Sequence, residues 1–97
     1  MPVVLVQQGP TLTQEKYDEV ATKVWGGKSK ADSPADWPVD GLLVHAAGQG
    51  PNGFRVVDVW ESEEAARRFG EKLQPILADS GVNEEPEVYE AHTFVSA

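Results

Sequence analysis

The sequence predicts a single α+β domain of the ferredoxin-like type, with a four-stranded antiparallel sheet and two helices in the order β-α-β-β-α-β. Four short runs rich in β-branched and aromatic residues alternate with two stretches whose apolar residues recur at helical spacing. A dense group of turn residues at 48–53 joins the two central runs and indicates a β-hairpin. The chain has 97 residues, which is single-domain length, so residues 1–97 are expected to form one unit. Alternating elements around a central hairpin are typical of the split βαβ arrangement.

The first strand and the first helix occupy the N-terminal part of the chain. Residues 3–6 form a β-branched run that predicts a strand. Thr11 has Gln14 at capping-box spacing, and Thr13 is a rival cap for the same helix. The apolar stripe of this helix extends to the glycine pair at 26–27, which is expected to end it.

The second half of the chain contains the hairpin, the second helix and the last strand. Residues 41–47 and 54–61 predict the two strands of the hairpin. Ser62 is expected to cap the second helix, which begins with two glutamates where the helix dipole favours acidic residues. Pro75 is expected to break or kink this helix just before its own position. Residues 88–95 alternate enough to predict the fourth strand.

Residues 28–40 form the longest irregular stretch of the sequence. Charged, polar and proline residues fill it without any periodicity. A loop of this length in a small domain is usually functional or disordered. Trp37 lies within it and indicates that part of the loop folds back onto an apolar surface, as a lid over a pocket or as an anchor for the loop.

Composition and charge exclude several functional classes. The chain has no cysteine, which excludes disulfides and thiol nucleophiles, and no spacing of its two histidines suggests a metal site. Its net charge of −8 predicts no binding to nucleic acid or to anionic membrane surfaces. Residues 1–10 lack the features of a signal peptide, so a cytoplasmic location is expected.

Apolar residues on both faces of the third predicted strand indicate a homodimer. Phe54, Val56 and Trp60 share one face of this strand, whereas Val57 and Val59 share the other. Two helices can cover only one face of a four-stranded sheet. A second copy of the chain is therefore expected to cover the other face.

Two segments of the sequence resemble a known protein family. The run Trp60-Glu61-Ser62-Glu63-Glu64-Ala65 and the hairpin of residues 41–45 and 54–60 resemble small actinobacterial proteins of the antibiotic-biosynthesis-monooxygenase-like group. This group belongs to the dimeric α/β-barrel superfamily. The resemblance implies the ferredoxin-like fold and a dimeric α/β barrel. Its implications for function are broad, since the superfamily includes cofactor-free quinone-forming monooxygenases, heme-degrading enzymes, isomerases, cyclases, dehydratases and proteins without known activity.

The heme-degrading subfamily can be tested against individual residues. Its members carry an amide on the first strand, a tryptophan at the end of the third strand and a heme-ligating histidine on the second helix. Gln7 or Gln8 matches the amide and Trp60 matches the tryptophan. The second predicted helix has no histidine, and Gly70 stands near the expected position. Heme degradation of this type is therefore not expected, and no cofactor is predicted.

His45 and Asp58 are the candidate catalytic residues. Asp58 is a carboxylate within an apolar strand, where it is costly unless it is paired or solvated. Pairing of Leu43 with Asp58 would place His45 opposite Val56, with His45 and Asp58 on one face of the sheet. A His–Asp pair in a pocket can act as an acid/base unit, and it can equally be a structural hydrogen bond.

The candidate substrate-binding residues are mostly aromatic side chains around this pair, joined by two polar residues. Aromatic rings supply binding energy in an apolar pocket, although core packing is the alternative role for the ring on the first helix. His92 is included because it lies on the same face of the last predicted strand as Val88. The full set is Trp60, Phe54, Tyr17, Trp37, Gln7 and His92.

Three functions of different classes fit these residues. The first is a cofactor-independent enzyme that acts on a small apolar or aromatic, polyketide-like molecule as a monooxygenase, an isomerase or a cyclase. The second is a non-catalytic dimer that binds a small-molecule ligand in the same pocket. The third is a structural dimer without a pocket.

Overall fold

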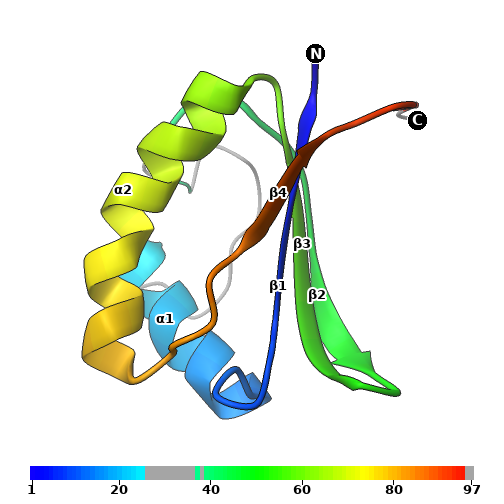
Figure 1. The fold of residues 1–97 in the computed structure, drawn as a ribbon. Helices are drawn as coiled ribbons and strands as arrows, with labels where there is room; N and C mark the ends of the chain where they lie inside the picture. Colours follow the sequence, from blue (N-terminus) through cyan, green and yellow to red (C-terminus); the bar gives the residue numbers. More distant parts are fainter. Residues whose placement is uncertain (26–36, 38, 96–97) are drawn as a thin grey trace.

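The protein has the predicted ferredoxin-like fold, in which two helices lie on one face of a four-stranded antiparallel sheet (Figure 1). The computed structural model describes residues 1–25, 37 and 39–95. Neighbouring strands follow the order β2-β3-β1-β4. The elements are β1 (Val3–Gln8), α1 (Gln14–Val24), β2 (Leu42–Gly50), β3 (Gly53–Trp60), α2 (Glu63–Ser80) and β4 (Glu87–Glu90). Of the irregular stretch predicted at 28–40, residues 28–36 and 38 lie outside the described residues.

Both helices begin at hydroxyl caps. The side chain of Thr13 accepts a hydrogen bond from the backbone N–H of Lys16 at 3.2 Å, so Thr13 and not Thr11 is the cap of α1. Ser62 accepts a hydrogen bond from the N–H of Ala65 at 3.1 Å and caps α2, as predicted. Each cap satisfies a backbone donor that the first turn of a helix cannot satisfy by itself.

The expected break of the second helix at Pro75 is wrong. The helix α2 continues through Pro75 to Ser80 and ends at Gly81, whose φ of 78° is left-handed. Proline removes one helical hydrogen bond. The ring of Pro75 is exposed, whereas Leu73 and Leu77 on either side of it are buried. Burial of this apolar stripe outweighs the loss of one bond on the exposed side.

The hairpin is tighter than the sequence suggests. Strand β2 extends to Gly50, which pairs with Gly53, so Pro51 and Asn52 alone form the turn. Gly53 has a φ of 120°, which glycine adopts without strain. The predicted pairing of Leu43 with Asp58 is therefore wrong by two residues.

Strand β4 is shorter than the predicted 88–95. It pairs with β1 only over Glu87–Glu90, opposite Val6 to Val3. Strand β1 begins at Val3, so residues after Glu90 have no β1 residue to pair with. One further hydrogen bond runs from the N–H of Ala91 to the carbonyl of Pro2 at 2.9 Å. His92 lies beyond the strand and is exposed.

The main core lies between the sheet and α2. Trp60 is fully buried, and its ring centroid lies 4.9 Å from that of Phe69 on α2. Among the described side chains, the indole Nε1 of Trp60 is buried without a hydrogen-bond partner. Val3, Leu5 and Leu73 pack into the same cluster. Burial of these aromatic and aliphatic side chains together stabilises the domain.

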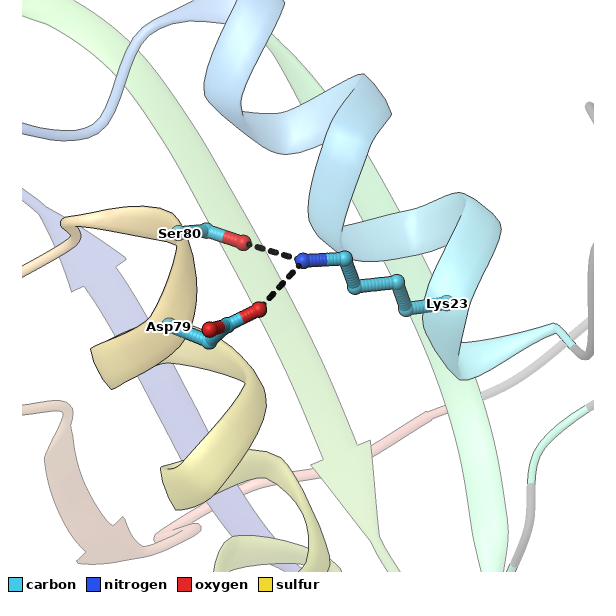
Figure 2. Close-up of polar contacts among 3 residues, drawn as sticks. All are labelled: Lys23, Asp79 and Ser80. Carbon is cyan, nitrogen blue, oxygen red and sulfur yellow. Dashed lines mark hydrogen bonds and ion pairs between the residues drawn. The ribbon is translucent and has the colours of Figure 1, made fainter.

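A polar contact joins the C-terminal ends of the two helices (Figure 2). The ammonium of Lys23 on α1 lies 3.0 Å from Asp79 Oδ2 and donates to the Ser80 hydroxyl at 3.2 Å. Asp79 is exposed, and such an ion pair contributes only about 0–1 kcal/mol. The buried Ser80 hydroxyl gains a partner, and the end of α1 is held against α2. Neither helix of the described ranges is long and apolar enough to cross a membrane.

The sheet face opposite the helices is apolar. Figure 1 views the sheet nearly edge-on, with both helices on one side of it. Val4, Val57 and Val59 lie on the opposite face, together with Val44 and Tyr89, which are 39% and 50% exposed. No helix or strand of the described part of the chain covers this face.

Candidate active site

Asp58 lies in the middle of β3 on the face that points toward the helices. Its side chain is only 3% exposed, although its neighbours Val57 and Val59 are apolar. A buried carboxylate needs hydrogen-bond partners to offset the loss of hydration. The nearest partner is His45, whose Nδ1 lies 2.5 Å from Asp58 Oδ1.

His45 is directly opposite Asp58 in the β2–β3 ladder. The predicted placement of the two residues on one face is confirmed, and they are closer than predicted. The other ring nitrogen, Nε2, lies 2.6 Å from the hydroxyl oxygen of Tyr17 on α1. The side chain of His45 is 18% exposed. One imidazole therefore connects a buried carboxylate to a phenol.

The three residues form a continuous hydrogen-bonded chain from Asp58 through His45 to Tyr17. When the Tyr17 hydroxyl donates to Nε2 of a neutral imidazole, Nδ1 carries the proton and donates to Asp58. A carboxylate that fixes the tautomer of an imidazole, which in turn contacts a hydroxyl, follows the logic of a catalytic triad. The arrangement can accept a proton at one end and stabilise the resulting imidazolium at the other.

Tyr17 is the hydroxyl end of the chain. The pKa of Tyr17 is raised from 10.0 to about 12, chiefly by burial and further by the negative charges of Asp58 and then Asp18. The phenol is therefore protonated at neutral pH. It donates a hydrogen bond at rest and ionises only if its proton passes to a base.

Aromatic rings surround the imidazole of His45. The ring of Trp37 lies 4.8 Å from it, and the ring of Tyr17 is nearly parallel to it, with the centroids 6.0 Å apart and an interplanar angle of 15°. Trp25 contacts Trp37 at 5.7 Å and Tyr17 at 6.5 Å. These rings limit the access of water to the hydrogen-bonded chain.

A pocket lies between the sheet and the two helices, at the hydrogen-bonded chain. Its cavity volume is about 50 Å³, which is room for a few water molecules. Four polar residues lie in its wall: Gln7, Tyr17, His45 and Asp58. The other lining residues are aliphatic or aromatic: Leu5, Leu12, Val20, Ala21, Val24, Trp25, Trp37, Val56, Phe69, Leu73 and Leu77.

Gln7 is held in the pocket wall by the loop between α2 and β4. Its side-chain amide nitrogen donates to the backbone carbonyl of Glu84 at 3.0 Å. The Glu84 carboxylate in turn accepts hydrogen bonds from the hydroxyl of Thr11 and from the Thr11 backbone N–H, the latter at 3.1 Å. Gly9 makes this close approach possible, because a Cβ there would lie 2.0 Å from Glu84 Cγ.

The structure brings together His45, Asp58, Tyr17, Trp37 and Gln7 from the predicted set, and it places the other three residues elsewhere. Trp60 is a core residue that does not line the pocket. Phe54 is buried outside the pocket wall, with its ring 5.2 Å from that of Tyr17. His92 is exposed beyond β4. Within the described ranges, no group of three or more histidine, aspartate or glutamate side chains is placed to hold a metal ion.

Three contributions were not predicted from the sequence. Tyr17 was expected to supply an aromatic surface, whereas its hydroxyl bonds His45. Trp25, on the apolar stripe of the first helix, was not assigned to the pocket, and it lines the pocket. Glu84 orients Gln7 from a position 77 residues away. Helical spacing indicated the inward direction of Tyr17 and Trp25, but no sequence signal indicated the contact of Glu84.

Comparison with known proteins identifies the fold. No protein-family model matches the chain, and no curated protein matches its sequence. A candidate monooxygenase from Shewanella loihica PV-4 is structurally similar, with a TM-score of 0.58, 18% identity and coverage of 96% of each chain. A single-residue variant of SnoaB, a cofactor-independent oxygenase from Streptomyces nogalater, has a TM-score of 0.59 and 15% identity over 99% of this chain and 98% of SnoaB. The chain shares the fold of these two proteins.

Proposed function

We propose that this protein is a cofactor-independent enzyme that acts on a small aromatic molecule of the polyketide type. The observation that carries the proposal is the chain from Asp58 through His45 to Tyr17, which lies at the polar part of an otherwise apolar pocket. A pocket with a few convergent polar groups and a perturbed pKa is the usual form of an active site. The names of the two structural neighbours agree with an oxygenase, but identities of 15–18% support the fold alone.

In the proposed mechanism, Tyr17 and His45 act as one base. The substrate transfers a proton to the Tyr17 oxygen while the Tyr17 proton passes to Nε2 of His45. The imidazolium that forms is stabilised by Asp58, which remains a carboxylate. This route avoids a free tyrosinate, which the raised pKa of Tyr17 makes unfavourable.

Oxygenation follows from this proton transfer when the substrate is an aromatic ketone with an acidic CH₂ group. Loss of one proton gives an electron-rich carbanion, which reacts with O₂ to form a peroxide anion. This anion takes the proton back from the Tyr17–His45 pair and becomes a hydroperoxide. Loss of water then gives a second carbonyl group, so that CH₂ and O₂ become C=O and H₂O. Isomerisation or cyclisation would need only the proton-transfer part of this sequence.

The pocket must widen before it admits a substrate of this class. Pockets for small-molecule ligands usually measure about 300–1,000 Å³, whereas the cavity here is about 50 Å³. Trp37 is the residue best placed to move, because it is partly exposed and covers His45. We propose that Trp37 acts as the lid and packs on the bound ring.

The protein is also proposed to be a homodimer, joined through the apolar face of the sheet. The exposed parts of Val44 and Tyr89 and the valines of β1 and β3 support this arrangement. Monomeric proteins rarely leave a large apolar patch in contact with water. A second copy packed sheet to sheet would cover it.

Oxygen uptake with anthrone tests the proposed function. Purified protein without added cofactor should consume one O₂ per anthrone and release anthraquinone and water, at a rate well above that of anthrone in the same buffer. Bovine serum albumin at equal concentration controls for non-specific binding. A rate equal to the buffer rate, with no isomerised or cyclised product from a panel of related aromatic ketones, would contradict catalysis and leave ligand binding as the function.

A further inference from the structure

Gln7 is a polar residue of the pocket wall that takes no part in the chain from Asp58 to Tyr17. The residue is 96% buried, since its exposed fraction is 4%. It lies on the same sheet face as Asp58, because Gln7 pairs with Val56 and Asp58 is two residues further along β3. We propose that Gln7 determines ligand specificity by accepting a hydrogen bond at Oε1 from the hydroxyl group of a neutral aromatic ligand.

The orientation of the Gln7 amide is fixed by its partner. A backbone carbonyl can only accept a hydrogen bond, so the nitrogen of the amide must face the Glu84 carbonyl at 3.0 Å. The oxygen Oε1 is therefore turned away from Glu84. Among the described residues, no donor reaches Oε1, and Gln7 lines the pocket. Within the described part of the pocket wall, Oε1 is thus an acceptor that is open to a ligand.

The loop that carries Glu84 is held in place by further contacts. Thr11 donates to the Glu84 carboxylate through both its N–H and its hydroxyl, and the Thr11 hydroxyl accepts from the N–H of Asn83 at 2.8 Å. These bonds hold the carbonyl that orients Gln7. An acceptor that is fixed before binding loses little freedom when the ligand arrives, which favours selectivity.

The charge of the pocket favours a neutral ligand. Asp58 is one of the groups that raise the pKa of Tyr17, so a second negative charge near the carboxylate is unfavourable. A phenolic hydroxyl is neutral and donates one hydrogen bond, which is what Oε1 lacks. A ligand with a methyl group in the same place could not form this hydrogen bond with Oε1.

Phenol and toluene test this inference because they have nearly the same shape and differ in the hydroxyl group. Calorimetry gives the ratio of the two dissociation constants for wild type and for Gln7→Met, which keeps the length of the side chain. The preference for phenol over toluene should fall about tenfold in Gln7→Met, the effect of one hydrogen bond. An unchanged ratio would overturn the assignment.

A matched control separates the acceptor from the substitution itself. Gln8→Met makes the same chemical change at the next residue of β1, which does not line the pocket, so the ratio should stay within twofold of wild type. An equal fall in Gln8→Met and Gln7→Met would overturn the role of Oε1. In the wild-type protein, the NMR signal of the Gln7 side-chain carbonyl carbon should shift with phenol and not with toluene, and this measurement does not depend on a variant that folds.

This inference rests on the pocket of the proposed function, but its test does not require turnover. A phenol preference that depends on Gln7, combined with no oxygen uptake, would support the ligand class and contradict the oxygenase. Oxygen uptake, combined with a ratio of phenol to toluene dissociation constants that is unchanged in Gln7→Met, would support the oxygenase and contradict the role of Gln7.

Discussion

His45 and Asp58 face each other directly across the β2–β3 ladder, with Nδ1 of the imidazole 2.5 Å from Oδ1 of the carboxylate. A tight turn at Pro51 and Asn52 sets this register. The pairing is regular from the turn to Val44, and the irregularity between Leu42 and Val44 comes only after the His45–Asp58 pair. The hairpin therefore fixes the two groups independently of the helices. Helix α1 then adds the Tyr17 hydroxyl, so the position of α1 determines whether the chain is complete.

The raised pKa of Tyr17 predicts a specific loss of stability at high pH. The unfolded chain releases this proton at the ordinary pKa of 10.0, whereas the folded protein retains it up to about pH 12. The contribution of Tyr17 is thus fully present below pH 10 and is lost as pH rises toward 12. Urea denaturation should show that wild type loses about 1–2 kcal/mol more than Tyr17→Phe between pH 9.5 and 11.5, after allowance for the screening of a half-buried group. Parallel stability curves for the two proteins would contradict the assigned environment of Tyr17.

Removal of the Asp58 charge should lower the pKa of Tyr17. Asp58→Asn keeps the shape of the side chain and removes the second cause of the shift, whereas burial of the ring remains. Absorbance titration in a Tyr89→Phe background leaves Tyr17 as the tyrosine that titrates, since the sequence has two tyrosines. Its midpoint should fall below that of the same background with Asp58 intact but stay above 10. Identical midpoints would show that Asp58 does not act on Tyr17.

Trp37→Ala should weaken ligand binding more than it weakens folding. The ring covers His45 and is partly exposed, so its removal is expected to lower the unfolding free energy by less than about 1.5 kcal/mol. Trp60→Ala is the matched comparison, because Trp60 is fully buried and should cost about 3–5 kcal/mol. Thermal melts and calorimetry with phenol measure both effects. A similar loss of stability in the two variants would place Trp37 in the core and exclude the lid.

The dimer prediction depends on which face of the sheet carries a substitution. Val44 is 39% exposed on the sheet face that the two helices leave uncovered. Val88 is 49% exposed on the edge strand β4 and belongs to the helix side of the sheet. Light scattering at micromolar concentration should give about twice the chain mass for wild type and for Val88→Asp, and the chain mass for Val44→Asp. A charge buried in an interface without a partner is strongly unfavourable. A monomeric wild type would contradict the dimer.

Much of the fold could be predicted because side-chain periodicity reports it directly. The alternation of β3 placed Asp58 and Trp60 on the helix-facing side, and the hydroxyl of Ser62 marked the start of α2. The register of the hairpin was predicted two residues away from its position. Strands alternate with a period of two, so an error of two residues still placed His45 and Asp58 on one face.

The remaining features depend on tertiary contacts that have no local signal. The distance between Tyr17 and His45 depends on how α1 packs over the sheet, which periodicity does not determine. Glu84 reaches Gln7 because two loops that are distant in sequence meet at the end of β1. Pro75 was expected to end a helix, but its exposed position and the buried leucines around it allow the helix to continue.

Turnover of Asp58→Asn tests most directly the central claim that Asp58, His45 and Tyr17 act together to move a proton. Glu61→Gln is the matched control, since it makes the same chemical change at an exposed carboxylate just beyond β3. With anthrone and O₂, Asp58→Asn should lower the rate by about 10²-fold or more while stability changes by about 1–2 kcal/mol, and Glu61→Gln should react as wild type does. If Asp58→Asn retains the full rate, the hydrogen-bonded chain is structural and the proposed mechanism is wrong.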